Sequence, residues 1–203
     1  MPLPPESFDG AGIYAIYYGG LYGLYQPISS ASCESSPIYV GKAVPSGSRR
    51  GGFLEAATGR AVSSRLGQHA ASIRAHQEWG EQQGVEHLRL EDFACRYLVV
   101  DDIWIPLGEA ILISHYQPVW NAVVDGFGKH ASGAGRTQGR RSLWDELHPG
   151  RAWALNEQNA QKSRAEIEAD VAAHFQQVSS ATRIEGDDLE AAIEEVLGDD
   201  AED

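Results

Sequence analysis

Two short runs of β-branched and aromatic residues lie in the first quarter of the chain. Residues 12–18 have the sequence GIYAIYY and residues 37–42 the sequence PIYVGK, with glycine, proline or serine around each run. Runs of this composition with such boundaries are typical of β-strands. We predict a two-stranded hairpin whose connection, residues 19–37, is a long irregular loop, because it is rich in glycine, serine and tyrosine.

The alternation of side chains along a strand determines which residues lie on each face of this hairpin. Successive residues point to opposite faces, so Tyr14 is opposed to Ile13, and Tyr39 to Ile38. If both isoleucines face the core, both tyrosines lie together on the other face, next to Lys42. A tyrosine pair is also an ordinary cross-strand contact, so this pattern alone is explained as readily by a structural role.

A helix is predicted over residues 58–79. Its apolar residues recur every three or four positions, as in a helix with one buried face: Val62, Leu66, Ala70 and Ile73. Arg65 and His69 are four residues apart, so they share one side of the helix beside this stripe. By themselves, a surface arginine and histidine at this spacing need no chemical role.

A third strand is predicted at residues 93–101 and a second helix from Pro106 to Tyr116. Proline suits the first helical position, and the helix is apolar around its circumference, which predicts that it is buried. Glu109 lies near its start, where a buried carboxylate is costly unless it is compensated. The helix N-terminus, a divalent metal ion such as Mg²⁺ or an arginine partner would each compensate it.

Two segments are basic and rich in glycine. The first, residues 45–52, follows the hairpin; the second begins at residue 126, beyond an extended step at residues 118–121 that ends the second helix. Glycine lets backbone approach a duplex, and arginine suits contacts with guanine and phosphate. The candidate DNA-contacting residues are Arg49, Arg50, Lys129, His130, Arg136, Arg140 and Arg141. A solvated loop and a disordered linker are the competing interpretations.

The C-terminal part is predicted to be helical and then acidic. Residues 142–153 suggest a short helix and turn anchored by two tryptophans, and residues 156–177 an amphipathic helix with Ile167, Val171 and Phe175 on its contact face. We divide the chain into a core at 1–125 with an insertion at 19–37, a basic and tryptophan-anchored segment at 126–153, a helix at 154–178 and an acidic tail at 179–203. The tail is typical of a solvated appendage, although residues 187–197 suit a last short helix.

Composition changes the interpretation mainly through where the charge lies. The chain has 203 residues and a net charge of −13, which argues against nucleic-acid binding, but the tail holds −9 of it. Cys33 and Cys95 are too few and too isolated for a disulfide framework or a structural zinc site. Neither a signal peptide nor a membrane-spanning stretch is evident, so a cytoplasmic protein is expected.

These separated elements together resemble the GIY-YIG nuclease superfamily. Gly12-Ile13-Tyr14 and Tyr39-Val40-Gly41 match its two named tripeptides, with valine replacing one isoleucine. Matching positions follow in the same order and on the same predicted elements: Arg65, Glu109 and Asn121, with His69 matching the type II restriction branch. The resemblance implies an α+β fold, with a small three-stranded antiparallel sheet flanked by helices and a C-terminal helical extension.

The resemblance also implies the chemistry of the site. Glu109 would hold one Mg²⁺, replaceable by Mn²⁺, Arg65 would stabilise phosphate charge, and Asn121 would fix the site by hydrogen bonds. Tyr14 is the candidate base for water, with Tyr39 or His69 as alternatives. A free phenol titrates near pH 10, so Tyr14 would need nearby positive charge, from Lys42, Arg65 or the metal, to act at neutral pH.

Residues 126–153 resemble the SacII-type restriction enzymes in particular, through the glycine-rich basic segment and the run WDELHPGR. This implies a homodimer that cuts double-stranded DNA at a palindromic, GC-rich site of the CCGCGG type, and a cognate DNA methyltransferase that protects the genome. The long loop at 19–37 and the acidic tail depart from the family pattern. The alternatives are a repair or homing nuclease of the same superfamily and a non-catalytic DNA-binding regulator.

Overall fold

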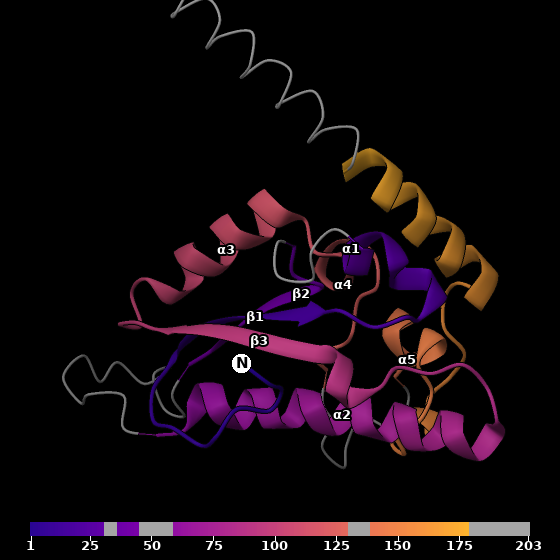
Figure 1. Cartoon of the computed structure of the whole chain (residues 1–203), viewed down its shortest axis with the longest axis horizontal. Helices are drawn as coiled ribbons and strands as arrows, with labels where there is room; N and C mark the ends of the chain where they lie inside the picture. The colour runs from indigo at the N-terminus through magenta and orange to yellow at the C-terminus, as the bar shows by residue number, and fades with distance from the viewer. Residues whose placement is uncertain (31–35, 45–58, 130–138, 179–203) are drawn as a thin grey trace, which may run out of the picture.

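The protein folds as a mixed α+β structure around a three-stranded antiparallel sheet of order β2-β1-β3, as predicted. The computed structural model describes residues 1–30, 36–44, 59–129 and 139–178. The strands are β1 (Gly12–Tyr18), β2 (Tyr39–Ala43) and β3 (Phe93–Val99). Helix α2 (Ala61–Gln83) lies on one side of the sheet and α3 (Ile105–Tyr116) on the other (Figure 1).

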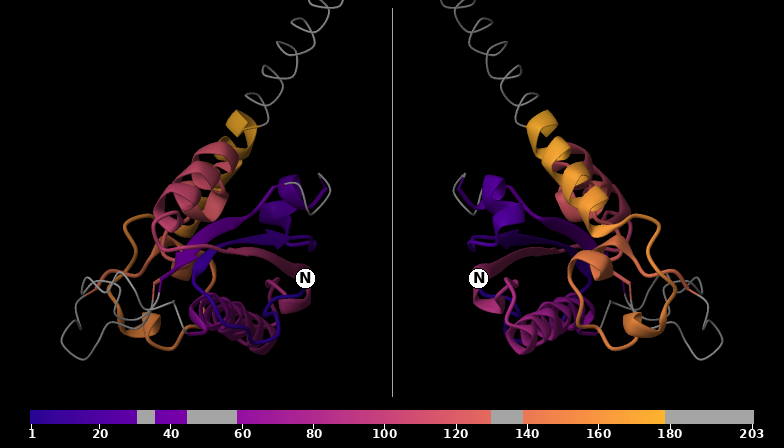
Figure 2. Two further views of the ribbon diagram at one scale, coloured as in Figure 1. Left: turned by 90° about the vertical axis from the view of Figure 1, so that its left-hand side faces the viewer. Right: turned by 90° about the vertical axis from the view of Figure 1, so that its right-hand side faces the viewer.

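β1 is the central strand and is buried on both faces. Tyr14, Ile16 and Tyr18 point toward α2 and belong to the main core, whereas Ile13, Ala15 and Tyr17 belong to smaller clusters beneath α3. Figure 2 shows from the side how the two helices enclose the sheet. The expectation that the tyrosines face away from the core is therefore wrong: α2 covers that face, and Tyr14 is only 2% exposed.

Helix α2 forms as its periodicity predicts. Its four predicted apolar positions are all buried in the main core: Val62, Leu66, Ala70 and Ile73. Two histidines, His69 and His76, are buried on the same side. The helix extends to Gln83, beyond the predicted end, and stops at Gly84, whose φ of 66° is the left-handed conformation common after a helix.

The prediction that α3 is buried all round is wrong. Only Ile105 is fully buried within it, while Leu107 and Ile111 are more than half exposed. Helix α3 packs on the sheet at Gly108, where an added Cβ would lie 2.7 Å from Ile13 Cδ1. Close packing therefore occupies one side of the helix and leaves an apolar side open.

Two irregular connections contain short helices instead. The hairpin connection includes η1 (Gly23–Tyr25) and α1 (Gln26–Ser30), and the step predicted as extended forms α4 (Val119–Ala122). Tyr25 is fully buried and Tyr22 nearly so, which shows that packing against the core organises the first connection. The segment 45–52 and the acidic tail lie outside the described residues.

The remaining elements complete the core around the sheet. They are η3 (Leu90–Asp92), α5 (Leu143–Leu147), η4 (Ala154–Asn156) and a helix over residues 164–178. Trp144 of α5 is fully buried, and the predicted contact residues Ile167, Val171 and Phe175 are buried, which confirms that face of the last helix. No helix in the described ranges combines the length and apolar content needed to cross a membrane.

Each edge of the sheet is partly covered. At the β2 edge, the Asn121 side chain accepts a hydrogen bond from Val40 N and donates one to Val40 O, each 2.8 Å long. At the β3 edge, Pro2 forms a bridge with Ala94, and Cys95 N donates to Met1 O at 2.8 Å. At Val40 and at residues 94–95, side-chain and terminal backbone groups thus take up hydrogen bonds that an edge strand leaves open.

A histidine pair lies within the aromatic core. The rings of His76 and His148 are 5.0 Å apart, His148 shares a 2.7 Å hydrogen bond with the Tyr25 hydroxyl, and His76 Nδ1 donates to Pro149 O. Burial lowers the pKa of His76 from 6.5 to about 4 and that of His148 well below its ordinary value. Both rings are therefore neutral in the folded protein near neutral pH.

We expect the free energy of unfolding to fall as the pH falls from about 6.5 toward 4. In this range the unfolded chain binds protons on these histidines and the folded chain does not, so acid favours unfolding. His76 alone accounts for about 3 kcal/mol, at about 1.4 kcal/mol per pH unit. Urea unfolding at pH 7 and pH 4 measures this difference: His76→Asn should flatten the pH dependence, whereas the exposed control His115→Asn should not. An unchanged slope in His76→Asn would contradict this assignment.

Candidate active site

The two tyrosines of the hairpin meet a histidine of α2. Tyr14 pairs with Gly41 and Ile16 with Tyr39 in the β1–β2 register, so the phenol rings lie on the same face, with centroids 6.3 Å apart. The Tyr14 hydroxyl shares a 2.7 Å hydrogen bond with His69 Nε2, and the Tyr39 ring lies 5.2 Å from the His69 ring. The three predicted residues thus form one cluster between the sheet and α2.

Gly41 makes room for this cluster. A Cβ at this position would lie 2.6 Å from the Tyr14 hydroxyl oxygen and 2.9 Å from Cε1 of Tyr39. Because Tyr14 is buried, its ring has little freedom to move away. The glycine of the second tripeptide is therefore required by the side chains on either side of it.

Arg65 lies one turn before His69 on α2, half-buried, and is held from two directions. Its Nη2 donates to Gly128 O at 2.6 Å and its Nη1 to Gln68 Oε1 at 3.1 Å. Phe127, next to that carbonyl, stacks on the His69 ring at 4.4 Å with an interplanar angle of 19°. Residues 127–128 therefore contact both α2 side chains of the site. The sequence carried no signal for these contacts beyond an aromatic residue between glycines.

Lys42 and Glu109 form an ion pair between β2 and α3. Lys42 Nζ lies 2.6 Å from Glu109 Oε2, and the Glu109 side chain is one-fifth exposed. Of the ways to compensate this carboxylate, the free protein uses a basic partner, a lysine. The pair is partly open to solvent, so the carboxylate is accessible to a competing cation.

The charge on the tyrosines is set by burial. Loss of solvent raises the pKa of Tyr14 far above its ordinary value of 10, Tyr39 adds to this, and the Arg65 guanidinium opposes it. Burial also raises the pKa of Tyr39, again with Arg65 opposing and Glu109 adding. Arg65 therefore does not overcome burial, and Tyr14 is a neutral phenol hydrogen-bonded to His69. The nearby positive charge that a phenolate needs at neutral pH is not sufficient in the free protein.

A single carboxylate can hold Mg²⁺, which usually binds one or two carboxylates together with waters and phosphate oxygens. Glu109 suits this role because its carboxylate is partly exposed and its ion-pair partner, Lys42, is a flexible side chain that is itself partly exposed. Among the residues that the structure describes, no three histidine, cysteine or acidic side chains are grouped as a complete metal cage would require. The single carboxylate of Glu109 fits a metal ion whose other ligands include waters and the phosphate oxygens of the substrate.

The predicted DNA-contacting residues are only partly described. Lys129 and Arg140 are exposed, whereas Arg141 is half-buried and pairs with Glu146 at 3.2 Å. Arg49, Arg50, His130 and Arg136 lie outside the described residues. The described part of the basic segment thus provides two free cationic side chains on either side of 130–138.

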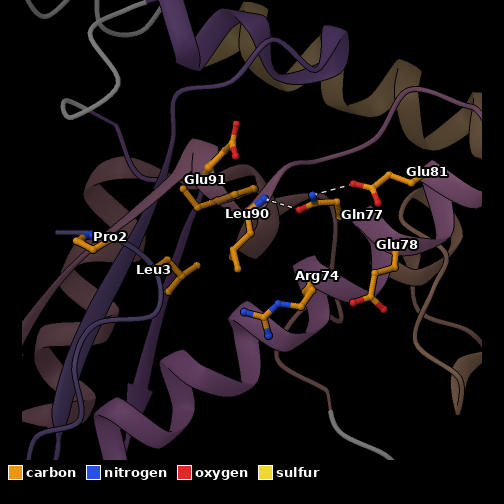
Figure 3. Close-up of a pocket in the computed structure, with 9 residues that line it drawn as sticks. Pro2, Leu3, Arg74, Gln77, Glu78, Glu81, Leu90 and Glu91 are labelled. Atoms are coloured by element: carbon orange, nitrogen blue, oxygen red, sulfur yellow. Dashed lines mark hydrogen bonds between the residues drawn. The ribbon is translucent and has the colours of Figure 1, made fainter.

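A separate hollow of about 540 Å³ lies on another part of the molecule (Figure 3). It is formed by Leu3, by Arg74 and Glu78 of α2 and by the segment around Leu90 and Glu91. Acidic side chains outnumber the single arginine along it, which disfavours a phosphate backbone. The tyrosine, histidine and Glu109 groups do not line this hollow.

Comparison with known protein families adds the identity. The family described as the Eco29kI GIY-YIG domain matches residues 6–175, which is most of the chain. The chain belongs to this restriction endonuclease family. It is therefore a DNA-cleaving enzyme whose substrate is DNA, and the restriction branch predicted from the sequence is confirmed. A comparison with curated proteins finds no match.

We expect Gly41→Ala to reduce DNA cleavage on the order of a hundredfold while the protein remains folded. The new methyl group would displace Tyr14 and Tyr39, and misplacing reacting groups by about 1 Å has an effect of this size. Gly67→Ala is the matched control, because a Cβ there meets no atom within 4 Å. Single-turnover cleavage rates with circular dichroism test this; equal rates in the two variants would contradict the steric argument.

Proposed function

We propose that this enzyme hydrolyses both strands of double-stranded DNA at a palindromic, GC-rich site, as a homodimer with one Mg²⁺ per active site. One observation carries the catalytic part. The buried Tyr14 hydroxyl lies 2.7 Å from His69 Nε2, Arg65 lies one turn before His69 on α2, and the partly exposed Glu109 of α3 pairs with Lys42 of the same hairpin. Near the same buried phenols, the guanidinium can bind a phosphodiester and the carboxylate can bind the metal ion that accompanies it.

In this proposal the proton leaves the attacking water through Tyr14. His69 Nε2, 2.7 Å from the Tyr14 hydroxyl, accepts the phenolic proton as the phenol takes one from water. The phenol thus never has to persist as an anion, which its raised pKa disfavours. The water oxygen bonds to phosphorus, the bond from phosphorus to the leaving ester oxygen breaks, and that oxygen takes a proton from solvent water. Tyr39 orients the water and phosphate from the neighbouring strand.

The negative charge of the phosphate is stabilised by Arg65 and by the metal ion that Glu109 would hold. Arg65 stabilises the negative charge that develops on the phosphate oxygens. Glu109 would hold the Mg²⁺, which supplies Lewis-acid stabilisation of the phosphoryl oxygens when bound. Lys42, which pairs with Glu109 in the free protein, would keep a positive charge beside the site. Asn121 holds β2 through Val40, and with it Tyr39 and Gly41.

The dimer part of the proposal rests on the open side of α3. Trp104, Leu107 and Ile111 are each more than half exposed and lie three or four residues apart, so they form one strip. Contiguous exposed apolar surface marks interaction sites, and aromatic residues are enriched in them. Helix α3 also carries Glu109, so pairing of two such helices would place two cleavage sites about one twofold axis, as a palindrome requires.

Specific reading of the site is assigned to the basic segments. Lys129 and Arg140 are free to contact phosphate or guanine, and the predicted residues Arg49, Arg50, His130 and Arg136 extend this set. A GC-rich site suits such side chains because guanine offers two acceptors in the major groove. A cognate methyltransferase would be needed to protect the host genome.

The deciding experiment is a gel of unmethylated phage DNA incubated with the protein and Mg²⁺. We expect discrete fragments that share one palindromic end, and none when the metal is chelated. Glu109→Gln should abolish cleavage but still shift DNA in a binding gel, because the change removes a metal ligand and not a DNA contact. Cleavage by Glu109→Gln at the wild-type rate would exclude its metal role, and a smear would exclude sequence specificity.

Leu107→Glu should convert the proposed dimer to a monomer. A carboxylate in a buried interface is costly, whereas Leu155→Glu, at a comparably exposed leucine away from α3, should leave the dimer intact. Sedimentation velocity measures the mass, and supercoiled plasmid shows whether the monomer only nicks. A wild-type protein that sediments as a monomer with and without DNA would exclude the dimer.

A further inference from the structure

A buried ion pair lies next to the active site but does not reach it. Arg151 Nε donates to Asp145 Oδ1 at 2.6 Å and its Nη2 to Oδ2 at 2.7 Å, which is a two-pronged contact. Arg151 is 5% exposed and Asp145 2% exposed. The guanidinium carbon also lies over two tryptophan rings, 4.4 Å from the ring centroid of Trp144 and 4.8 Å from that of Trp153.

The remaining N–H groups of Arg151 bind a single stretch of backbone. Nη2 donates to Gly126 O at 3.1 Å, and Nη1 donates to Phe127 O and Lys129 O, each at 3.2 Å. With the two bonds to Asp145, all five donors of the guanidinium have an acceptor. These carbonyl groups belong to a loop outside any helix or strand, so the arginine supplies hydrogen bonds that regular structure would otherwise provide.

The other side of this loop contacts the active site. Gly128 O, between the carbonyl groups that Arg151 binds, accepts the 2.6 Å bond from Arg65. The Phe127 ring stacks on His69 and lies 5.0 Å from the Tyr39 ring. Loop 126–129 therefore connects a rigid, fully bonded guanidinium with three of the proposed site residues.

We propose that Arg151 and Asp145 are positioning residues for the cleavage reaction. Asp145 fixes the guanidinium, the guanidinium fixes loop 126–129, and the loop sets the orientation of the Arg65 side chain and the His69 ring. This inference rests on the proposed function, since it assigns a role relative to that site. A buried ion pair contributes little net stability compared with apolar residues of similar size, so holding the loop explains the pair better than stability does.

The decisive variant removes both charges together. Asp145→Asn with Arg151→Met keeps similar volumes and the Ser142 cap of α5, and it leaves no unpaired buried charge. We expect a folded protein whose kcat falls on the order of tenfold to a hundredfold, with KM for DNA within about twofold. A folded double variant with wild-type kcat would overturn the proposal.

A conservative variant separates charge from geometry. Arg151→Lys keeps the ion pair with Asp145 but has only three donors, so it cannot serve the carboxylate and three carbonyl groups at once. We expect it to remain folded, because the buried charge stays paired, and to lose at least about fivefold in kcat. Full activity in Arg151→Lys would show that only the charge matters and would overturn the role of the guanidinium fork.

Arg164→Met is the matched control. Arg164 also contacts this region, donating to Leu147 O and the Tyr22 hydroxyl, but it does not touch loop 126–129. We expect its loss to change thermal stability without changing kcat. A fall in kcat equal to that of the double variant would mean that any lost arginine contact near α5 has this effect, and would overturn the specific assignment.

A measurement that does not depend on DNA cleavage separates the test of the positioning role from the test of the proposed function. The imidazole signals of His69, assigned by nuclear magnetic resonance in the free protein, should shift in the double variant and stay in place in Arg164→Met, because Phe127 stacks directly on that ring. A shift in a protein that cuts no DNA would uphold the positioning and refute the proposed function. Unmoved signals would overturn the positioning, whatever the cleavage assay gives.

Discussion

The central position of β1 is the constraint on which the rest of the structure depends. A strand paired on both edges and covered on both faces has no side chain free to face solvent, so Tyr14 has to find its partner inside the protein. That partner is His69, one turn beyond Arg65 on the helix that covers this face. The position of α2 therefore follows from apolar burial, and the proximity of its polar side chains to the hairpin follows from the position of α2.

Burial also determines which chemistry is accessible. In water, a phenol near a guanidinium would be a stronger acid; here the loss of solvent outweighs the arginine and keeps Tyr14 protonated. A neutral phenol that shares a hydrogen bond with His69 can pass one proton on as it takes another, so the phenol itself never bears a lasting charge. The carboxylate of Glu109 then remains accessible to a ligand, because its lysine partner is flexible and partly solvated.

The sequence predicted the elements whose patterns are local. The strands of the hairpin, the stripe of α2 and the contact face of the last helix were visible as periodicities, and the site residues as an ordered set of motifs. The prediction for helix α3 is wrong because an apolar circumference does not say which side of the helix the sheet covers. The helices within 19–37 were missed because Tyr22 and Tyr25 are organised by distant residues, and the contacts of Phe127 because stacking between residues 58 positions apart leaves no local pattern.

The partly covered edges of the sheet have a consequence for assembly. Asn121 takes the hydrogen bonds of β2 at Val40, and the segment with Pro2 lies along β3. A second molecule therefore cannot extend this sheet into a continuous intermolecular one by adding its own strand at these positions. Any association through the exposed side of α3 would use side chains alone, so its strength and symmetry could evolve through substitutions on that helix while the backbone that carries the tyrosines stays unchanged.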